Sequence, residues 1–115
     1  MDTQLMKETF NTAYNYSFEL TKGIDLLSKQ IKQDDPSFPQ TLHQLIIGLE
    51  WYLTAVEKTS TIQNKILDLE VINQHLSNIN DAIKNDNVLY ISDIFKYEIK
   101  ESIEEWQGFN RDYYM

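Results

Sequence analysis

Apolar residues recur at helical spacing along most of the chain and divide it into four amphipathic segments. In the first segment, residues 3–33, they follow alternating steps of four and three, which is the spacing of one buried helix face. The segment would be about 45 Å long as an unbroken helix. Gly23 lies inside it, so a bend at that point is the alternative to a continuous helix. The predicted face consists of Met6, Phe10, Ala13, Ser17, Leu20, Ile24, Leu27 and Ile31.

The second segment begins after the stretch QDDPSFPQ, because Pro36 and Pro39 do not fit inside a helix but are tolerated in a first turn. Ser37 followed by Gln40 fits a capping box. We therefore predict a second helix over residues 38–59. Its core face is Leu42, Leu45, Ile46, Leu49, Tyr52, Leu53 and Val56.

Two further helices are predicted, over residues 61–84 and 87–107. Ser60 or Thr61 would cap the third helix, although a helix running unbroken through this point is also compatible with the pattern. Asp86 or Asn87 would cap the fourth, and the tail 108–115 shows no period. The third face is Ile62, Ile66, Leu69, Ile72, Leu76, Ile79 and Ile83, and the fourth is Val88, Ile91, Phe95, Ile99, Ile103 and Trp106.

Four amphipathic helices with short connections predict an all-α fold, an antiparallel up-and-down four-helix bundle with a long first helix. The 115 residues suffice for one domain, 1–115, and the chain is 42% hydrophobic with seven Tyr, five Phe and two Trp. That aromatic content argues against disorder. Only three Gly and two Pro are present, which leaves little turn chemistry for a fold of many strands.

Residues that commonly carry catalysis or bind metals are scarce. The chain has no Cys and only two His, His43 and His75, neither with a Glu three residues before it as di-iron bundles require. The carboxylate pairs Asp34/Asp35 and Glu104/Glu105 fit solvated surfaces better than an acid–base site. We therefore expect no catalytic residue, no metal site and no cofactor, and hence no enzyme.

The net charge of −8 would repel a phosphate backbone, so we expect no nucleic-acid partner. No stretch is long and apolar enough to cross a membrane, and the N-terminus does not resemble a signal peptide. A cytoplasmic protein is the expectation. Residues 86–115 hold seven acids and three bases, so the last quarter of the chain carries half of the excess charge.

Two predicted helices carry apolar residues on a second side. Opposite the core face of the second helix lie Ile47, Trp51 and Ala55, with Glu50 and Glu57 on one flank. Apolar residues with charged neighbours are typical of interfaces. The alternative is that the long first helix or the C-terminal tail covers them. The fourth helix repeats the feature with Tyr90, Ile94 and Tyr97, which share their side with Asp93, Glu101 and Glu104.

These second faces favour a protein–protein interaction module, whose partner is another protein or a second copy of the chain in a homodimer. The alternative is a chaperone or a neutralising, immunity- or antitoxin-like partner of a basic or amphipathic client, for which the acidic last quarter is the motivation. In length, charge and helix count the chain is similar to flagellar export chaperones and to small immunity or antitoxin proteins. No motif ties it to one of them.

Overall fold

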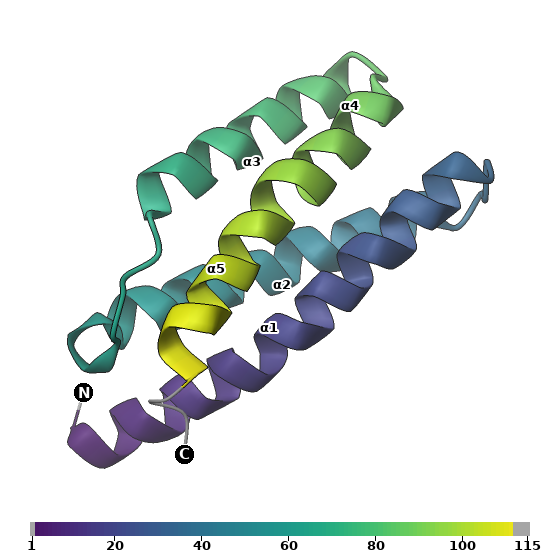
Figure 1. The fold of residues 1–115 in the computed structure, drawn as a ribbon. Helices are drawn as coiled ribbons and strands as arrows, with labels where there is room; N and C mark the ends of the chain where they lie inside the picture. The colour runs from purple at the N-terminus through teal and green to yellow at the C-terminus, as the bar shows by residue number, and fades with distance from the viewer. Residues whose placement is uncertain (1, 112–115) are drawn as a thin grey trace.

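Four helical rods run alternately up and down in the computed structural model, which describes residues 2–111 (Figure 1). The first two rods are long, and the third is shorter and packs on the fourth. The fourth rod, the C-terminal helix 88–110, contains three consecutive elements. The helices are α1 (Thr3–Lys32), α2 (Phe38–Lys58), η1 (Ser60–Ile62), α3 (Leu69–Lys84), α4 (Val88–Asp93), η2 (Ile94–Ile99) and α5 (Lys100–Asn110).

The prediction of an all-α, antiparallel four-helix bundle with a long first helix is confirmed. The principal extents are 44 × 22 × 21 Å, so α1 spans the whole length of the molecule. Every predicted core residue of α1 is buried except Met6, and on α2 only Ile46 is less than fully buried. The stepwise pattern of apolar residues therefore identifies the sides on which these helices pack.

α1 is one continuous helix, and Gly23 serves packing within it. A Cβ atom on Gly23 would lie 2.9 Å from Leu45 Cδ2 of α2, which is too close for a real contact. The Leu45 methyl group therefore occupies space that a side chain at position 23 would need. Asp2 caps α1 by accepting a hydrogen bond of 2.8 Å from the Leu5 N–H.

The capping box predicted at the start of α2 is wrong. Ser37 has a helical backbone and makes no side-chain cap, although Pro39 does lie in the first turn. Asp35 supplies the local acceptor instead, because its Oδ1 accepts a hydrogen bond of 2.9 Å from the Ser37 N–H. Asp34 reverses the chain just before it, with a positive φ of 53°.

The third helix begins at Leu69, so the predicted start at residue 61 is wrong. Asp68 is the actual cap, with Oδ1 accepting from the Val71 N–H at 3.2 Å. Residues 63–68 form a non-helical linker that crosses one end of the bundle (Figure 1). In this linker Leu67 is buried, whereas Ile66, which the helical pattern places in the core, is 58% exposed.

Side chains of α5 hold the linker in place. Trp106 Nε1 donates a hydrogen bond of 3.0 Å to Gln63 Oε1. The fully buried Asn110 accepts from the Asn64 N–H at 2.8 Å and donates to the Lys65 carbonyl at 3.1 Å. The two Asn110 bonds satisfy linker backbone groups that a helix would otherwise satisfy, and they come from a residue more than forty positions away. That is why a local pattern could not predict the linker.

The C-terminal helix begins at the predicted Asn87 cap, whose Oδ1 accepts from the Tyr90 N–H at 3.3 Å. It continues to Asn110, beyond the predicted end at residue 107, and the residues 112–115 of the predicted tail lie outside the described residues. Its middle element, η2, is π-helical. The buried Ile91, Phe95, Ile99 and Ile103 recur every fourth residue, and in a regular α-helix each such step overshoots a full turn by about 40°. The wider turn of η2 takes up this overshoot and keeps the four side chains facing the core.

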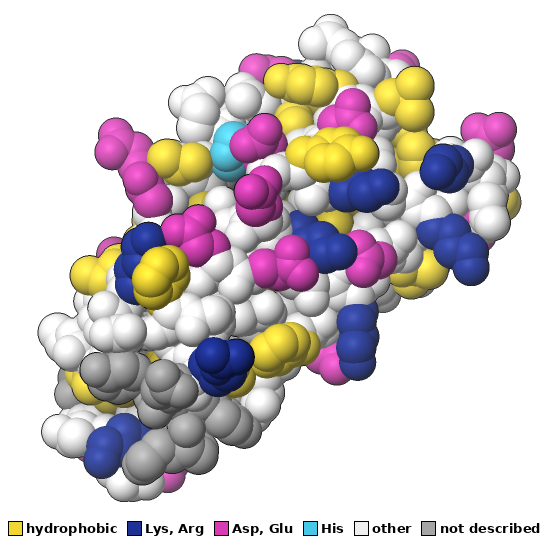
Figure 2. Space-filling model, in the orientation of Figure 1, with side chains coloured by type: hydrophobic (Ala, Val, Ile, Leu, Met, Phe, Trp, Pro, Cys, Tyr) yellow, Lys and Arg dark blue, Asp and Glu magenta, His cyan; other side chains and the backbone are white. Residues whose placement is uncertain are grey.

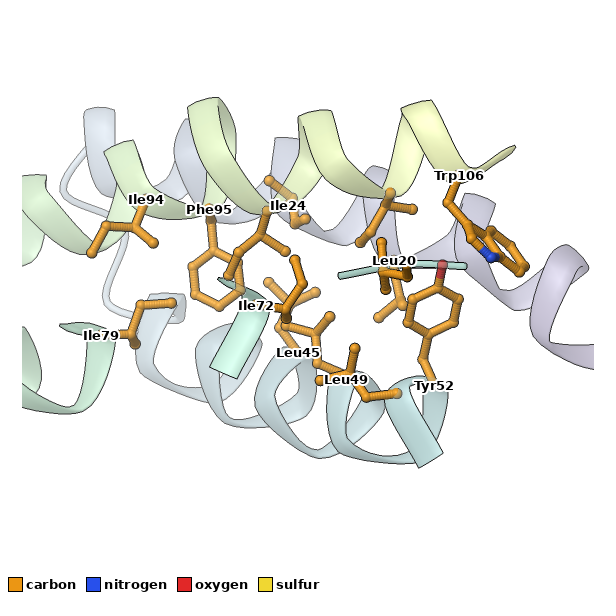
Figure 3. Close-up of a cluster of buried hydrophobic side chains, with 14 of the residues drawn as sticks. Leu20, Ile24, Leu45, Leu49, Tyr52, Ile72, Ile79, Ile94, Phe95 and Trp106 are labelled. Atoms are coloured by element: carbon orange, nitrogen blue, oxygen red, sulfur yellow. The ribbon is translucent and has the colours of Figure 1, made fainter. Parts of the chain in front are cut away.

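The core runs along the axis of the bundle (Figure 3). At one end Tyr52 meets Trp106 edge to face, with ring centroids 5.4 Å apart. At the other end Ile94 points toward Ile79 of α3, because the C-terminal helix packs on α3 as well as on α1. The Tyr52 hydroxyl is buried with no hydrogen-bond partner among the described residues, and this burial raises its pKa well above the usual value.

Candidate functional site: a groove between α1 and α2

A surface groove of about 430 Å³ lies between the two long helices. Its walls are mostly apolar, although two of the lining side chains carry a hydroxyl and one carries an amide. Two of the residues predicted as interface residues, Ile47 and Trp51, belong to it. The full lining is Thr12 and Tyr16 from α1, and Gln44, Ile47, Gly48 and Trp51 from α2. We call this feature the α1–α2 groove.

The groove exists because a glycine forms part of its base. Gly48 is buried, and a Cβ atom there would collide with the hydroxyl of Tyr16. The Tyr16 ring leans instead over the glycine and meets the Trp51 ring edge to face, with centroids 5.4 Å apart and an interplanar angle of 89°. The two aromatic rings thus support each other across the helix pair.

Ile47 and Trp51 remain largely in water, with exposures of 54% and 44%. Covering a side chain of this kind is worth roughly 1.5–3 kcal/mol, so the pair offers a partner a substantial gain. Neither α1 nor any other described element covers them. Ala55, which was predicted to share their side, is only 4% exposed, so its placement on an outer face is wrong.

The charged residues around the groove are all acidic. Within one helical turn of its lining residues, at steps of three or four, the only formal charges are those of Glu8, Glu19 and Glu50, and all three are exposed. Glu19 Oε1 lies 3.7 Å from Lys22 Nζ, and both side chains are largely exposed to solvent. An exposed pair of this kind is weak, so Glu19 stays available to another cation.

The second predicted patch is only partly at the surface. Tyr90, Tyr97 and Glu101 are exposed on the C-terminal helix, but Ile94 is 4% exposed, so its placement on the outer side is wrong. Ile94 is buried because α3 covers a side of this helix that a two-helix contact would leave open. None of these residues lines the α1–α2 groove, so the structure does not join the two predicted patches into one site.

The face over α3 and the C-terminal helix carries many acidic side chains, interspersed with hydrophobic ones (Figure 2). A smaller pocket of about 260 Å³ lies on this side, between the linker and α5. Lys65 borders it, with Nζ 2.9 Å from Glu105 Oε1 and 4.0 Å from the centre of the Phe109 ring. Both partners of this ion pair are about half exposed, so the pair is weak as well.

Neither histidine lines the groove. His43 is exposed on α2, whereas His75 of α3 is half-buried, with Nε2 3.8 Å from Glu98 Oε2. Within residues 2–111, no three side chains of the metal-binding types gather into a site. In the same range, no helix is both long enough and apolar enough to cross a membrane.

Sequence reasoning found two of the six lining residues of the groove, Ile47 and Trp51, from their position opposite the α2 core face. Tyr16 and Thr12 were not identified, although they lie one turn apart beside the α1 core face. Their pairing with α2 depends on which sides of the two helices meet, which the pattern of one helix does not specify.

The family model described as "Domain of unknown function (DUF8042)" matches residues 8–109, which include every residue of the α1–α2 groove. No curated protein matches the chain. No solved structure matches it either.

Proposed function

The chain belongs to the DUF8042 family, and we propose that it is a non-enzymatic protein-binding module whose binding surface is the α1–α2 groove. The observation that carries the proposal is the exposure of Ile47 and Trp51 in a concave surface. An isolated exposed apolar residue is ordinary, but two of them in one groove mark a binding site more specifically.

The lining favours binding over catalysis. No carboxylate, histidine or other strong acid or base lines the groove, so a bound molecule would meet apolar surface and a few hydrogen-bonding groups. Tyr16 adds a hydroxyl to the lining beside its apolar ring. A tyrosine that combines apolar ring surface with a hydroxyl is a typical interface residue.

The occupant we propose is an amphipathic helix of another protein. A groove between two packed helices accepts the side chains of a third helix, which inserts apolar anchors spaced at i, i+3, i+4 and i+7. The apolar lining residues of α2 are themselves spaced by one turn, from Ile47 to Trp51. Adjacent anchors of a docked helix would therefore meet adjacent turns of α2.

A peptide-display selection tests the proposal. Helical peptides are selected on the wild-type protein and then assayed on Ile47→Asp and on the control Leu89→Asp, which alters an even more exposed apolar residue of the C-terminal helix. Both variants retain the fold, because both side chains are largely in solvent. We expect selected peptides to lose about tenfold or more in affinity for Ile47→Asp and little for Leu89→Asp. Peptides that bind all three proteins equally would contradict a binding role for the groove.

Self-association is a separate outcome that light scattering resolves. A groove reserved for another protein predicts the mass of the 13.6 kDa monomer across a range of concentrations. A dimer that Ile47→Asp dissociates would show instead that a second copy of the chain fills the groove, and the proposed occupant would be wrong.

A second candidate function, a neutralising or chaperone-like partner of a basic client, is favoured by the C-terminal helix. Its exposed side carries Asp93, Tyr97, Glu101 and Glu104 in succession. Binding of a lysine-rich peptide should weaken in Asp93→Asn/Glu101→Gln/Glu104→Gln and in high salt. Unchanged binding in that variant would argue against this surface.

A further inference from the structure

We infer that the α1–α2 groove selects a basic amphipathic helix, one whose apolar anchors are flanked by lysine or arginine. This inference rests on the proposed function and adds the charge of the partner to it. Shape and apolar lining alone would accept a helix of any charge. The charges around the groove restrict the charge of the partner helix that it would bind.

The first argument is the sign of the charges around the groove. Glu8 and Glu19 follow the α1 side, and Glu50 lies on the α2 side next to Trp51. No lysine or arginine lies within four residues of a lining residue along either helix, and the cation paired with Glu19, Lys22, is exposed and 3.7 Å away. A partner with acidic flanks would place like charges against this rim, whereas a basic one would form ion pairs around an apolar centre.

The second argument is the aromatic pair inside the groove. The rings of Tyr16 and Trp51 present π faces, and Trp51 has much of its surface in water. The negative face of an aromatic ring attracts a cation, and tryptophan does so most strongly. A partner lysine or arginine would therefore gain from the rings as well as from the carboxylates.

The third argument concerns spacing. Glu8 and Glu19 are eleven residues apart, which is about 16 Å or three turns along α1. A partner helix that lies along the groove would meet one of them near each end of its contact. Cations about three turns apart, with apolar anchors between them, match this arrangement. Long lysine and arginine side chains also have the reach to bridge to the rim.

The same charges disfavour a second copy of the chain as occupant. A two-fold dimer through the groove would bring two sets of Glu8, Glu19 and Glu50 together. The chain as a whole carries a net charge of −8, so two copies also repel at longer range.

Two synthetic peptides test the inference by calorimetric titration. Both have about four helical turns with leucine at the anchor positions, and one carries lysine on its flanks where the other carries glutamate. The protein variants are the rim variant Glu8→Gln/Glu19→Gln/Glu50→Gln and the control Glu70→Gln/Asp81→Asn/Asp86→Asn. The control removes the same number of exposed charges from α3 and the turn after it, outside both proposed binding surfaces. Ile47→Asp serves as the test of the groove itself.

We expect the lysine peptide to bind and the glutamate peptide to bind at least tenfold more weakly. The rim variant should lose about tenfold in affinity for the lysine peptide, and the control variant less than about threefold. Equal affinity for both peptides, or equal losses in the rim and control variants, would overturn the charge inference. If Ile47→Asp still abolished binding in that case, the proposed function would stand. If neither peptide bound, or if Ile47→Asp had no effect, both the inference and the proposed function would fail.

Discussion

The hydroxyl of Tyr16 lies over Gly48, in space that the Cβ atom of any other residue would occupy. This contact shapes the α1–α2 groove, because it holds the Tyr16 ring in place across the helix pair and against Trp51. The identity of one glycine in α2 therefore determines the position of an aromatic ring in α1.

Replacing Gly48 with alanine should destabilise the protein, although alanine is the better helix former. The gain in helix propensity is about 1 kcal/mol, whereas forcing an extra methyl group into a packed contact costs about 1–3 kcal/mol. We expect a net fall in the free energy of unfolding of about 1 kcal/mol, measured by urea denaturation. The same variant should bind groove ligands more weakly, because Tyr16 must move.

The sign of this effect should reverse when the tyrosine is absent. In a Tyr16→Ala background the obstructing ring is gone, so Gly48→Ala should stabilise by up to about 1 kcal/mol. Equal effects of Gly48→Ala in the two backgrounds would show that the Tyr16–Gly48 contact does not limit the packing of α1 against α2.

Tyr52→Phe should leave the protein as stable as the wild type or make it more stable. The Tyr52 hydroxyl is buried without a partner among the described residues, and such a group costs about 1–3 kcal/mol in lost hydration. Removing it should raise the free energy of unfolding by about 1 kcal/mol in denaturant titrations at neutral pH. A clear loss of stability would mean that the hydroxyl is hydrogen-bonded in solution.

The same residue should make stability fall at alkaline pH. Burial raises the pKa of Tyr52 in the folded state above the usual value of 10.0, so the unfolded state loses its phenolic proton first. The contribution of protonated Tyr52 to the free energy of unfolding is therefore fully present below about pH 10. It is lost as the pH rises toward the folded-state pKa. Lys100, whose pKa is raised chiefly by its hydrogen bond to Asp25, contributes a decline in the same direction. Tyr52→Phe should remove only the part of this decline that Tyr52 contributes. If the plots of stability against pH for the wild type and the variant remain parallel above pH 10, the decline does not come from Tyr52.

Asn110→Ala should release the linker 63–68. The amide of Asn110 makes three hydrogen bonds, to the Asn64 N–H and to the carbonyls of Lys65 and Trp106. Losing them should cost about 2–4 kcal/mol of stability and should speed hydrogen exchange in the linker before the rest of the protein.

The exposed Asn85 provides a control for this variant. Its side chain makes one bond, to the Asp81 carbonyl, so Asn85→Ala should cost at most about 1 kcal/mol. If amide hydrogen exchange in the linker speeds up equally in both variants, Asn110 does not hold the linker in place.

The sequence predicts the bundle and the inward sides of its two long helices well. The buried faces of α1 and α2 each repeat at one period over many turns, and burial of such a face determines how a helix packs. The C-terminal helix is also predicted correctly on its main face, from Ile91 to Trp106.

The errors occur where partners distant in sequence decide the structure. Residues 63–68 follow a helical pattern, but Asn110 and Trp106 bind them in a non-helical form. Ala55 and Ile94 lie opposite one core face and yet are buried, Ile94 because α3 packs on the C-terminal helix. A periodic pattern shows which sides of a helix are apolar, but it does not show how many neighbours will cover them.

For the same reason, the sequence predicts the α2 side of the groove but not the α1 side. Ile47 and Trp51 are conspicuous as apolar residues on the outer side of α2, whereas Tyr16 and Thr12 belong to the site only because α1 packs beside them. The sign of the rim charges is visible in the sequence once the packing is known.

The most direct test of the central claim is an amide chemical-shift map of the labelled protein titrated with the lysine-flanked peptide. A basic amphipathic helix in the α1–α2 groove predicts the largest shifts at Thr12, Tyr16, Gln44, Ile47 and Gly48, and at the indole N–H of Trp51. The indole of Trp106, which lies in the core, should move little. Shifts concentrated on the C-terminal helix, or spread evenly over the acidic surface, would contradict the claim.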